Sequence, residues 1–383
     1  MYKIFFNLSA TIFISTFWFA SLNGQTTLNI SLKSASAIDY KQVVDLSTIS
    51  YIRLETNDNS LIGNDFKVRH NDSIVVLISN KIIVFSISGK HLFSIDKRGK
   101  GPGEYLSLTD IQIINNTNFL ILDRRGKKIL QIDSNGSTIK TIPIDLHGLA
   151  FEFINQSTLA IYSGSDWTDS SKDRLNFFDL KSQKIVKSLF PISQNEYQWR
   201  YFQGIQNFQK SEEDLFFYMD CKDTIFSVSQ DRLQPAIILN FGENKMPPKY
   251  IQREYASIRD FVTLVERENM IYNIIEMNIT DKHCSIGFRE KKNYYHFISN
   301  PRGSAGRLIN NYQDFLGFEK LSMVPNFDNF PRFWNDELSY IIIEPTDFMD
   351  KDDFKIPSNV TSKLGIVMGD NPIIVTFKYR DEL

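Results

Sequence analysis

The five histidines offer the widest range of possible chemistry in this chain, yet their spacing argues against a metal site. No two of them form an HxH, HxxxH or HExxH pattern, the spacings that place two imidazoles on one metal ion. Asp350, Asp352 and Asp353 come closest to a calcium loop and are interpreted as a solvated acidic turn. We therefore expect neither a metal nor a cofactor. The histidines are His70, His91, His147, His283 and His296.

Nucleophile and acid–base patterns are equally sparse. No GxSxG motif occurs, and no local pattern nominates a pair of catalytic carboxylates among the many acidic residues. Cys221 and Cys284 lie too far apart in the chain for a metal-type pair, so a disulfide and two buried thiols both stay open. The sequence favours a binding protein over an enzyme.

A glycine-rich segment, KRGKGPGEY at 97–105, invites comparison with phosphate-binding loops. Its spacing fits neither a Walker loop nor a dinucleotide loop, and strand-like sequence flanks it on both sides. We interpret it as a crossover between structural units, where glycine permits sharp turns, and keep an anion site as the alternative. The crossover residues are Gly99, Gly101, Pro102, Gly103, Glu104 and Tyr105.

Several loops combine tryptophan with charged residues and are the candidate ligand contacts. Flat aromatic faces beside a polar group suit sugar or peptide ligands. The alternative is that the aromatic rings pack between structural units and that the cations are solvated turn residues. The candidates are Asp166 and Trp167 in one loop, Trp199 and Arg200 at a later crossover, Trp334 near the C-terminal third, and Arg124 and Arg125 in a tight turn.

The elements that must position these residues are recurring β-hairpins. Residues 74–95 and 119–142 each read as an apolar run, a polar break, a second run, a glycine turn and a third run. Asn135-Gly136 supplies the positive φ values of a tight turn. Gly136 follows Gly89, the glycine of the first hairpin's turn, by 47 residues, which is the spacing expected of a four-stranded propeller blade. Weaker copies follow at 159–190 and 215–241.

Residues 246–268 break this pattern. Apolar residues recur there at three- and four-residue spacing after Pro247-Pro248, which predicts a helical insertion between blades. Strand-like sequence then returns to the end of the chain. A closed ring of blades buries both faces of such hairpins and protects their edges, so we predict an all-β fold, a six-bladed β-propeller.

The N-terminus predicts export. Lys3 precedes a mostly apolar stretch ending near Leu22, which indicates a signal peptide at 1–24 and a single propeller domain at 25–383. A membrane anchor is the alternative, but polar residues dilute the stretch and no other segment could span a membrane. No cysteine follows for lipidation, so a periplasmic or secreted location is expected. Basic and acidic residues nearly balance, 43 against 45, which gives no indication of a nucleic-acid partner.

The stretch 45–63, the hairpin at 74–95 and the segment 97–111 together resemble the six-bladed, NHL-like β-propeller proteins of Bacteroidetes. The resemblance implies six blades and an envelope location but no common activity. It also implies that the strand at 49–54 joins 373–379 to close the ring.

The resulting hypothesis is an exported binding or scaffold protein of the bacterial envelope, with an unknown protein, peptide or glycan as ligand. The alternative is a glycan-active hydrolase or lyase that uses carboxylates or histidines lining the central channel.

Overall fold

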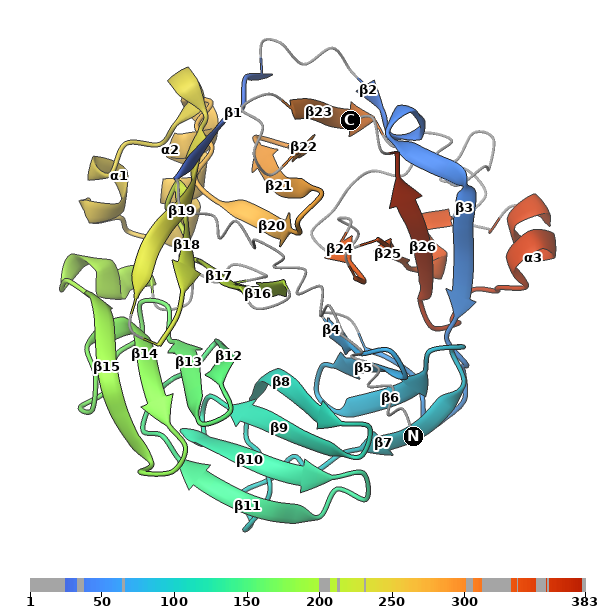
Figure 1. The fold of residues 1–383 in the computed structure, drawn as a ribbon, viewed down its shortest axis with the longest axis horizontal. Helices are drawn as coiled ribbons and strands as arrows, with labels where there is room; N and C mark the ends of the chain where they lie inside the picture. The colour runs from blue at the N-terminus through green and yellow to red at the C-terminus, as the bar shows by residue number, and fades with distance from the viewer. Residues whose placement is uncertain are drawn as a thin grey trace, which may run out of the picture.

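The computed structural model describes residues 25–380 apart from 33–37, 64–65, 200–206, 212–213, 231, 301–305, 312–331, 336, 349–355 and 357. The predicted signal peptide and Arg200 lie outside the described residues, as does the acidic run at 350–353. The strands form six separate sheets arranged radially around a centre, so the prediction of a six-bladed propeller is confirmed (Figure 1).

Blades one to three are continuous antiparallel meanders, each running from an inner to an outer strand (Figure 1). The first has β4 (Lys67–His70), β5 (Ile74–Ile78), β6 (Ile82–Ser86) and β7 (His91–Ile95). The second has β8 (Leu108–Asn115), β9 (Asn118–Asp123), β10 (Lys128–Asp133) and β11 (Thr138–Pro143). The third has β12 (Ala150–Asn155), β13 (Thr158–Tyr162), β14 (Asp173–Asp179) and β15 (Lys184–Pro191).

Blades four to six repeat the meander with additions. The fourth has β16 (Phe208–Ser211), β17 (Asp214–Tyr218), β18 (Thr224–Val228) and β19 (Leu233–Asn240). The fifth has β20 (Ile274–Ile279), β21 (Cys284–Glu290), β22 (Asn293–Ser299) and β23 (Gly306–Asn311). The sixth has β24 (Arg332–Phe333), β25 (Ser339–Ile343), β26 (Ile373–Tyr379) and β3 (Val44–Arg53).

The hairpin repeat has a direct physical basis. Every residue of β5 is buried because the blade packs against a neighbour on both faces, which explains the unbroken apolar run IVVLI. Gly89 and Gly136 occupy equivalent turns between the third and fourth strands of neighbouring blades, with φ of 87° and 73°. A side chain at Gly89 would also meet the Arg53 carbonyl oxygen at 2.1 Å. Glycine is therefore required there.

The ring closes between the two ends of the chain. β3 pairs antiparallel with β26, Arg53 opposite Ile373 and Tyr51 opposite Val375, which confirms the predicted closure. Two further strands were not predicted: β1 (Thr26–Asn29) pairs parallel with β19, and β2 (Ile38–Asp39) pairs parallel with β23. The N-terminal segment therefore covers the outer edges of blades four and five before it enters blade six (Figure 1).

A buried polar cluster holds this N-terminal segment to the ring. Tyr40, in the 3-10 helix η2 (Tyr40–Gln42), has its hydroxyl 2.8 Å from His296 Nδ1 and 2.8 Å from the Tyr379 hydroxyl. Ser285 Oγ hydrogen-bonds to the other nitrogen of His296. The 3-10 helix η2 and strands of blades five and six thus meet around one imidazole.

This cluster makes the protein sensitive to acid. Burial lowers the pKa of His296 to about 3, so the folded protein keeps this imidazole neutral while the unfolded chain protonates it near pH 6.5. Unfolding then takes up a proton, and stability is lost as pH falls from about 6.5 towards 3, by about 1.4 kcal/mol per pH unit. Urea denaturation at pH 4 to 7 measures the free energy of unfolding at each pH. For His296→Gln this free energy should fall with decreasing pH less steeply than for the wild type, by about 1.4 kcal/mol per pH unit. His91→Gln should match the wild type. Parallel curves for His296→Gln and wild type would contradict this role.

The two ends of the disc differ in their connections. In an antiparallel meander, the link between the second and third strands and the link to the next blade emerge at the same end of the sheet. At this end, which we call the long-connection face, lie the segments 163–172 and 241–273 and the described parts of two further connections, 192–199 and 358–372. Short turns such as 71–73 and 134–137 occupy the opposite face. Functional loops concentrate where a rigid scaffold carries long connections.

The predicted helical insertion lies on the long-connection face and is confirmed. It contains the 3-10 helix η4 (Gly242–Asn244), α1 (Lys249–Gln252) and α2 (Ile258–Arg267). Ser257 begins α2 as an N-cap, accepting a hydrogen bond from the Asp260 backbone N–H, and Phe261 and Val265 form its buried face. The remaining helices of the described chain are η3 (Asn195–Trp199), η5 (Pro345–Phe348) and α3 (Ser358–Leu364).

Candidate functional site

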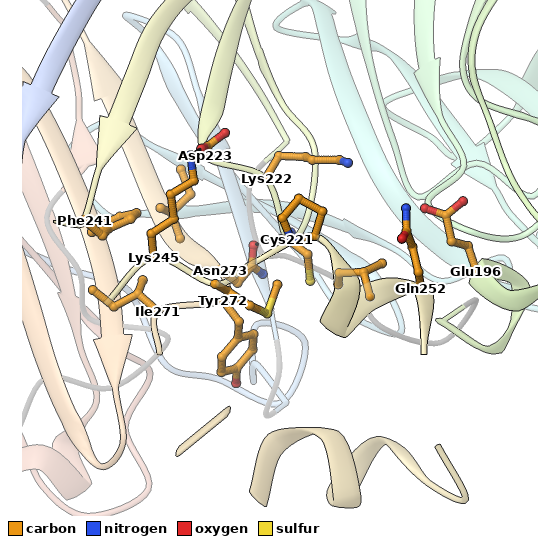
Figure 2. Close-up of a pocket in the computed structure, with 14 residues that line it drawn as sticks. Glu196, Cys221, Lys222, Asp223, Phe241, Lys245, Gln252, Ile271, Tyr272 and Asn273 are labelled. Carbon is orange, nitrogen blue, oxygen red and sulfur yellow. Dashed lines mark hydrogen bonds and ion pairs between the residues drawn. The ribbon is translucent and has the colours of Figure 1, made fainter. Parts of the chain in front are cut away.

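A pocket of about 320 Å³ opens on the long-connection face, between the β17–β18 turn and the helical insertion (Figure 2). This volume is at the lower end of the range for small-molecule sites. Its lining combines seven aliphatic or aromatic side chains with six charged or amide side chains and one cysteine. The residues are Glu196, Cys221, Lys222, Asp223, Phe241, Lys245, Met246, Pro248, Ile251, Gln252, Ile271, Tyr272, Asn273 and Ile274.

Trp199 supports the wall formed by the insertion. Its indole is 5% exposed, its Nε1 donates to the Ile251 carbonyl at 3.0 Å, and its ring lies 4.7 Å from that of Phe261. Trp199 was predicted as a ligand contact, whereas the structure places it inside the cluster that fixes α1 and α2. Its contribution to the pocket is indirect, because its hydrogen bond holds the backbone of Ile251, which lines the pocket.

The opposite wall is the β17–β18 turn. Cys221 has a φ of 61°, and its backbone N–H donates to Asn273 Oδ1 at 3.3 Å. The Tyr218 hydroxyl lies 2.7 Å from the same oxygen, and Asp220 accepts from the Tyr162 hydroxyl at 2.9 Å. The turn is therefore tied to the third and fifth blades as well as to its own, which makes this wall rigid.

The acidic groups of the lining are already matched with cations. Asp223 pairs with Lys245, and Glu196 pairs with Arg174 at 3.0 Å. Burial would raise the pKa of Asp223, but its hydrogen bonds from Lys245 and Thr224 bring it below its ordinary value. Burial opposes ionisation of Glu196 as well, and hydrogen bonds from Ser193 and the charge of Arg174 lower its pKa. Both carboxylates are ionised at neutral pH.

The cysteines provide no nucleophile. Burial, with the charge of Asp220, raises the pKa of the Cys221 thiol far above its ordinary value. Burial alone raises the pKa of Cys284 to about 12. Both residues are free thiols, which settles the question of a disulfide left open by the sequence. Neither thiol carries the thiolate that nucleophilic catalysis requires.

Three of the predicted contacts meet elsewhere on the same face. Arg124 lies 2.9 Å from the Asp166 carboxylate, and His147 Nδ1 lies at the same distance from it. Trp167 stacks on Tyr197, with ring centroids 4.4 Å apart, and Lys172 lies 5.9 Å from the indole centroid. The largely buried Arg124–Asp166 ion pair joins the connections of blades two and three, and Trp167 and Lys172 lie beside it.

The other predicted contacts are dispersed. Arg125 is exposed beside Arg124. Trp334 follows β24 at the short-turn end and stacks on His70, with ring centroids 4.2 Å apart. The structure therefore gathers Arg124, Asp166 and Trp167 but leaves Trp334 apart from them.

The glycine-rich segment runs from β7, an outer strand, to β8, the inner strand of the next blade. The Glu104 carboxylate turns back on the loop and accepts a hydrogen bond from the Gly101 N–H at 2.6 Å. A side chain at Gly99 would meet this carboxylate at 2.0 Å, and Gly103 has a φ of 78°. The loop's own carboxylate occupies the place that an anion would need.

Polar side chains on the inner strands form a second buried network, which the sequence did not single out. The Arg69 guanidinium lies 2.8 Å from Asp110, linking blades one and two, and Arg332 lies 2.8 Å from Glu276, linking blades six and five. Gln209 bonds both backbone groups of Ile279 in the next blade, donating at 3.0 Å and accepting at 2.6 Å. Gln209 thus supplies hydrogen bonds to the edge of an inner strand that has no further strand to pair with, and the two ion pairs link neighbouring blades.

The carboxyl groups of Glu152 and Glu276 on the inner strands have raised pKa values. Burial raises the pKa of Glu152 and of Glu276, and Arg69 and Arg332 respectively oppose the effect. Glu152 accepts from the Phe153 N–H at 2.9 Å and from Gln112 at 3.0 Å. The network links neighbouring blades, and both carboxylates already form hydrogen bonds or ion pairs within it.

Within the described part of the chain, no group of three His, Cys, Asp or Glu side chains could hold a metal ion. No helix among those residues is long and apolar enough to cross a membrane.

Comparisons with known proteins agree with this architecture. A family model described as a domain of unknown function (DUF4934) matches residues 26–378. A crystal structure of a candidate exported protein from Bacteroides fragilis superposes with a TM-score of 0.73 at 16% identity, covering 93% of this chain and all of that one. No protein of curated function matches.

More distant folds are also similar. A member of the DUF4221 family from Bacteroides vulgatus superposes with a TM-score of 0.44 at 10% identity, covering 88% of this chain and 99% of that one. Virginiamycin B lyase from Staphylococcus aureus superposes with a TM-score of 0.38 at 10% identity, covering 76% of this chain and 80% of that one.

Proposed function

The chain belongs to the DUF4934 family of domains of unknown function, and from its own geometry we propose a non-enzymatic binding protein of the bacterial envelope. The observation that carries the proposal is the pocket on the long-connection face. Its walls come from segments held in place by Trp199 and Asn273, and its lining combines apolar side chains with charged and amide groups. Preformed cavities in which placed polar groups orient a ligand against apolar side chains are the usual form of a small-ligand site.

Export to the periplasm or beyond is part of the proposal. It is supported by the apolar N-terminal stretch and by the similarity in fold to a candidate exported protein. Trp167 and Lys172, which lie beside the Arg124–Asp166 ion pair on the same face, would extend the contact area for a larger ligand or a partner protein.

A glycan-active hydrolase or lyase is the second candidate. The observation in its favour is the raised pKa of Glu152 and Glu276 around the centre of the ring, since a protonated carboxyl can act as a general acid. We rank it second because both groups already hydrogen-bond within the network that joins the blades.

A pocket-filling substitution tests the proposed function. Gln252→Trp places an indole at the pocket from the end of α1, whereas Gln194→Trp adds the same bulk at an exposed position outside the lining. In a ligand-observed NMR screen of a fragment library, a set of compounds should bind the wild type and Gln194→Trp but lose at least tenfold in affinity with Gln252→Trp.

Two results of this screen would contradict the proposal. If every binding fragment kept its affinity for Gln252→Trp, the pocket would not be the ligand site. If bound glycan or peptide fragments were converted to products in the same tubes, the enzymatic alternative would replace it.

A further inference from the structure

We propose that the pocket selects ligands that carry a single carboxylate next to an apolar group, and that Lys222 recognises the carboxylate. This inference rests on the proposed function and adds the chemical class of the ligand.

The charge balance of the lining is the first argument. Four charged side chains line the pocket: Glu196, Lys222, Asp223 and Lys245. Asp223 is neutralised by Lys245 and Glu196 by Arg174. Within the described part of the chain, Lys222 is the member of this set without an ion-pair partner. Among the lining side chains, Lys222 therefore carries a positive charge that no lining carboxylate pairs with. The Asp220 carboxylate of the same turn lies outside the lining and accepts a hydrogen bond from the Tyr162 hydroxyl. An anionic group of a ligand complements the Lys222 ammonium.

The uncommitted hydrogen-bond donors give the second argument. The Asn273 side chain is occupied by its contacts with Tyr218, Cys221 and Asp220. The Gln252 carboxamide, by contrast, makes no hydrogen bond to the residues that the structure describes. Figure 2 shows Lys222 and Gln252 toward one side of the pocket, with Glu196 beside Gln252, and the Asp223–Lys245 pair toward the other. The Glu196 carboxylate is neutralised there by Arg174. An ammonium and an amide N–H at one side provide donors for the oxygens of a carboxylate.

The apolar part of the lining restricts the rest of the ligand. Phe241, Met246, Ile251, Ile271 and Ile274 face the same cavity, so the body of the ligand must be apolar. A volume of about 320 Å³ suits a molecule of the size of an amino acid or a dipeptide. One lysine balances one negative charge, which favours a carboxylate over a doubly charged phosphate. A free apolar acid and the C-terminal residue of a peptide share this chemistry.

A matched set of probes tests the assignment. N-acetyl-leucine carries the anion, N-acetyl-leucinamide is neutral, and leucinamide carries a cation on the same side chain. Since Lys222 is exposed at the pocket, its ion pair is worth about 1 kcal/mol at most, which corresponds to about a fivefold change in Kd. By isothermal titration or NMR, the wild type should bind N-acetyl-leucine about fivefold more tightly than N-acetyl-leucinamide. It should bind the cationic leucinamide more weakly than either.

Variants of Lys222 give the decisive comparison. Lys222→Gln should abolish the preference for the acid over the amide, Lys222→Arg should retain it, and Lys249→Gln, which removes an exposed cation of α1 outside the lining, should leave it unchanged. N-acetyl-Ala-Ala-Leu distinguishes the sources: tighter binding than N-acetyl-leucine assigns the site to a peptide C-terminus, and weaker binding assigns it to a free acid.

Three outcomes would overturn the inference. Equal binding of acid and amide would show that the carboxylate is not recognised. A preference of Lys222→Gln for the acid would show that a group other than Lys222 recognises it. In both cases the pocket would still be a ligand site. Failure of all probes to bind would exclude this ligand class, and the proposed function would then fail only if the Gln252→Trp screen also detected no pocket ligand.

Discussion

Deletion of residues 372–383 should abolish cooperative unfolding of this protein. The deletion removes β26, which lies between β25 and β3 and is the strand through which the two ends of the chain close the ring. Its apolar residues contribute about 1.5–3 kcal/mol each. Their sum reaches the total stability of a typical domain, about 5–15 kcal/mol. The buried apolar residues of β26 that are lost are Ile373, Ile374, Val375, Phe377 and Tyr379.

Thermal unfolding followed by near-UV circular dichroism measures this effect. The shortened chain should lack a sigmoidal transition and expose apolar surface to a hydrophobic dye. Removal of residues 381–383 alone, which leaves β26 in place, serves as the control and should keep the transition. A truncated protein that melted at the wild-type temperature would show that the ring does not depend on this closure.

Asp110→Ala should be the most damaging single substitution on the inner strands. The Asp110 carboxylate is fully buried, pairs with Arg69 at 2.8 Å and accepts the Phe151 N–H of the next blade at 3.1 Å. Removing one partner of a buried ion pair leaves the other uncompensated and costs about 3–5 kcal/mol. We expect the free energy of unfolding in urea to fall by that amount.

The matched control is an exposed ion pair. Glu337 pairs with Lys378 at the same distance, 2.8 Å, but both side chains are largely exposed. Glu337→Ala should therefore change the stability little. If both substitutions had the same effect, the inner-strand network would not contribute to ring closure in the way described above.

The parts of the fold that could be predicted from the sequence are those determined by local chemistry. Gly89 and Gly136 are required by their backbone conformation, and β5 is apolar throughout because the blades cover both of its faces. β1 and β2 could not be predicted, because they are short and are formed by pairing with strands about 200 residues or more later in the chain. β24 has two residues and no alternation to detect.

The candidate site was also harder to predict, because it is formed by segments that are distant in the sequence. Trp199 is a residue type that is common at ligand contacts. It is buried because α2, an element distant in the sequence, covers it. Lys222 and Gln252 gave no local signal, because the pocket joins segments from 196 to 274. Arg124, Asp166 and Trp167, in contrast, do meet on the long-connection face, since the repeated hairpins place their loops at the same end of the disc.

The central claim is that a ligand occupies the pocket on the long-connection face. It is tested most directly by methyl NMR of isoleucine-labelled protein during titration with N-acetyl-leucine and the fragments that bind. The account predicts shifts of the Ile251, Ile271 and Ile274 methyl groups, which line the pocket, and none for Ile87 and Ile139, which are exposed elsewhere. Saturable shifts confined to methyl groups outside the pocket would contradict it.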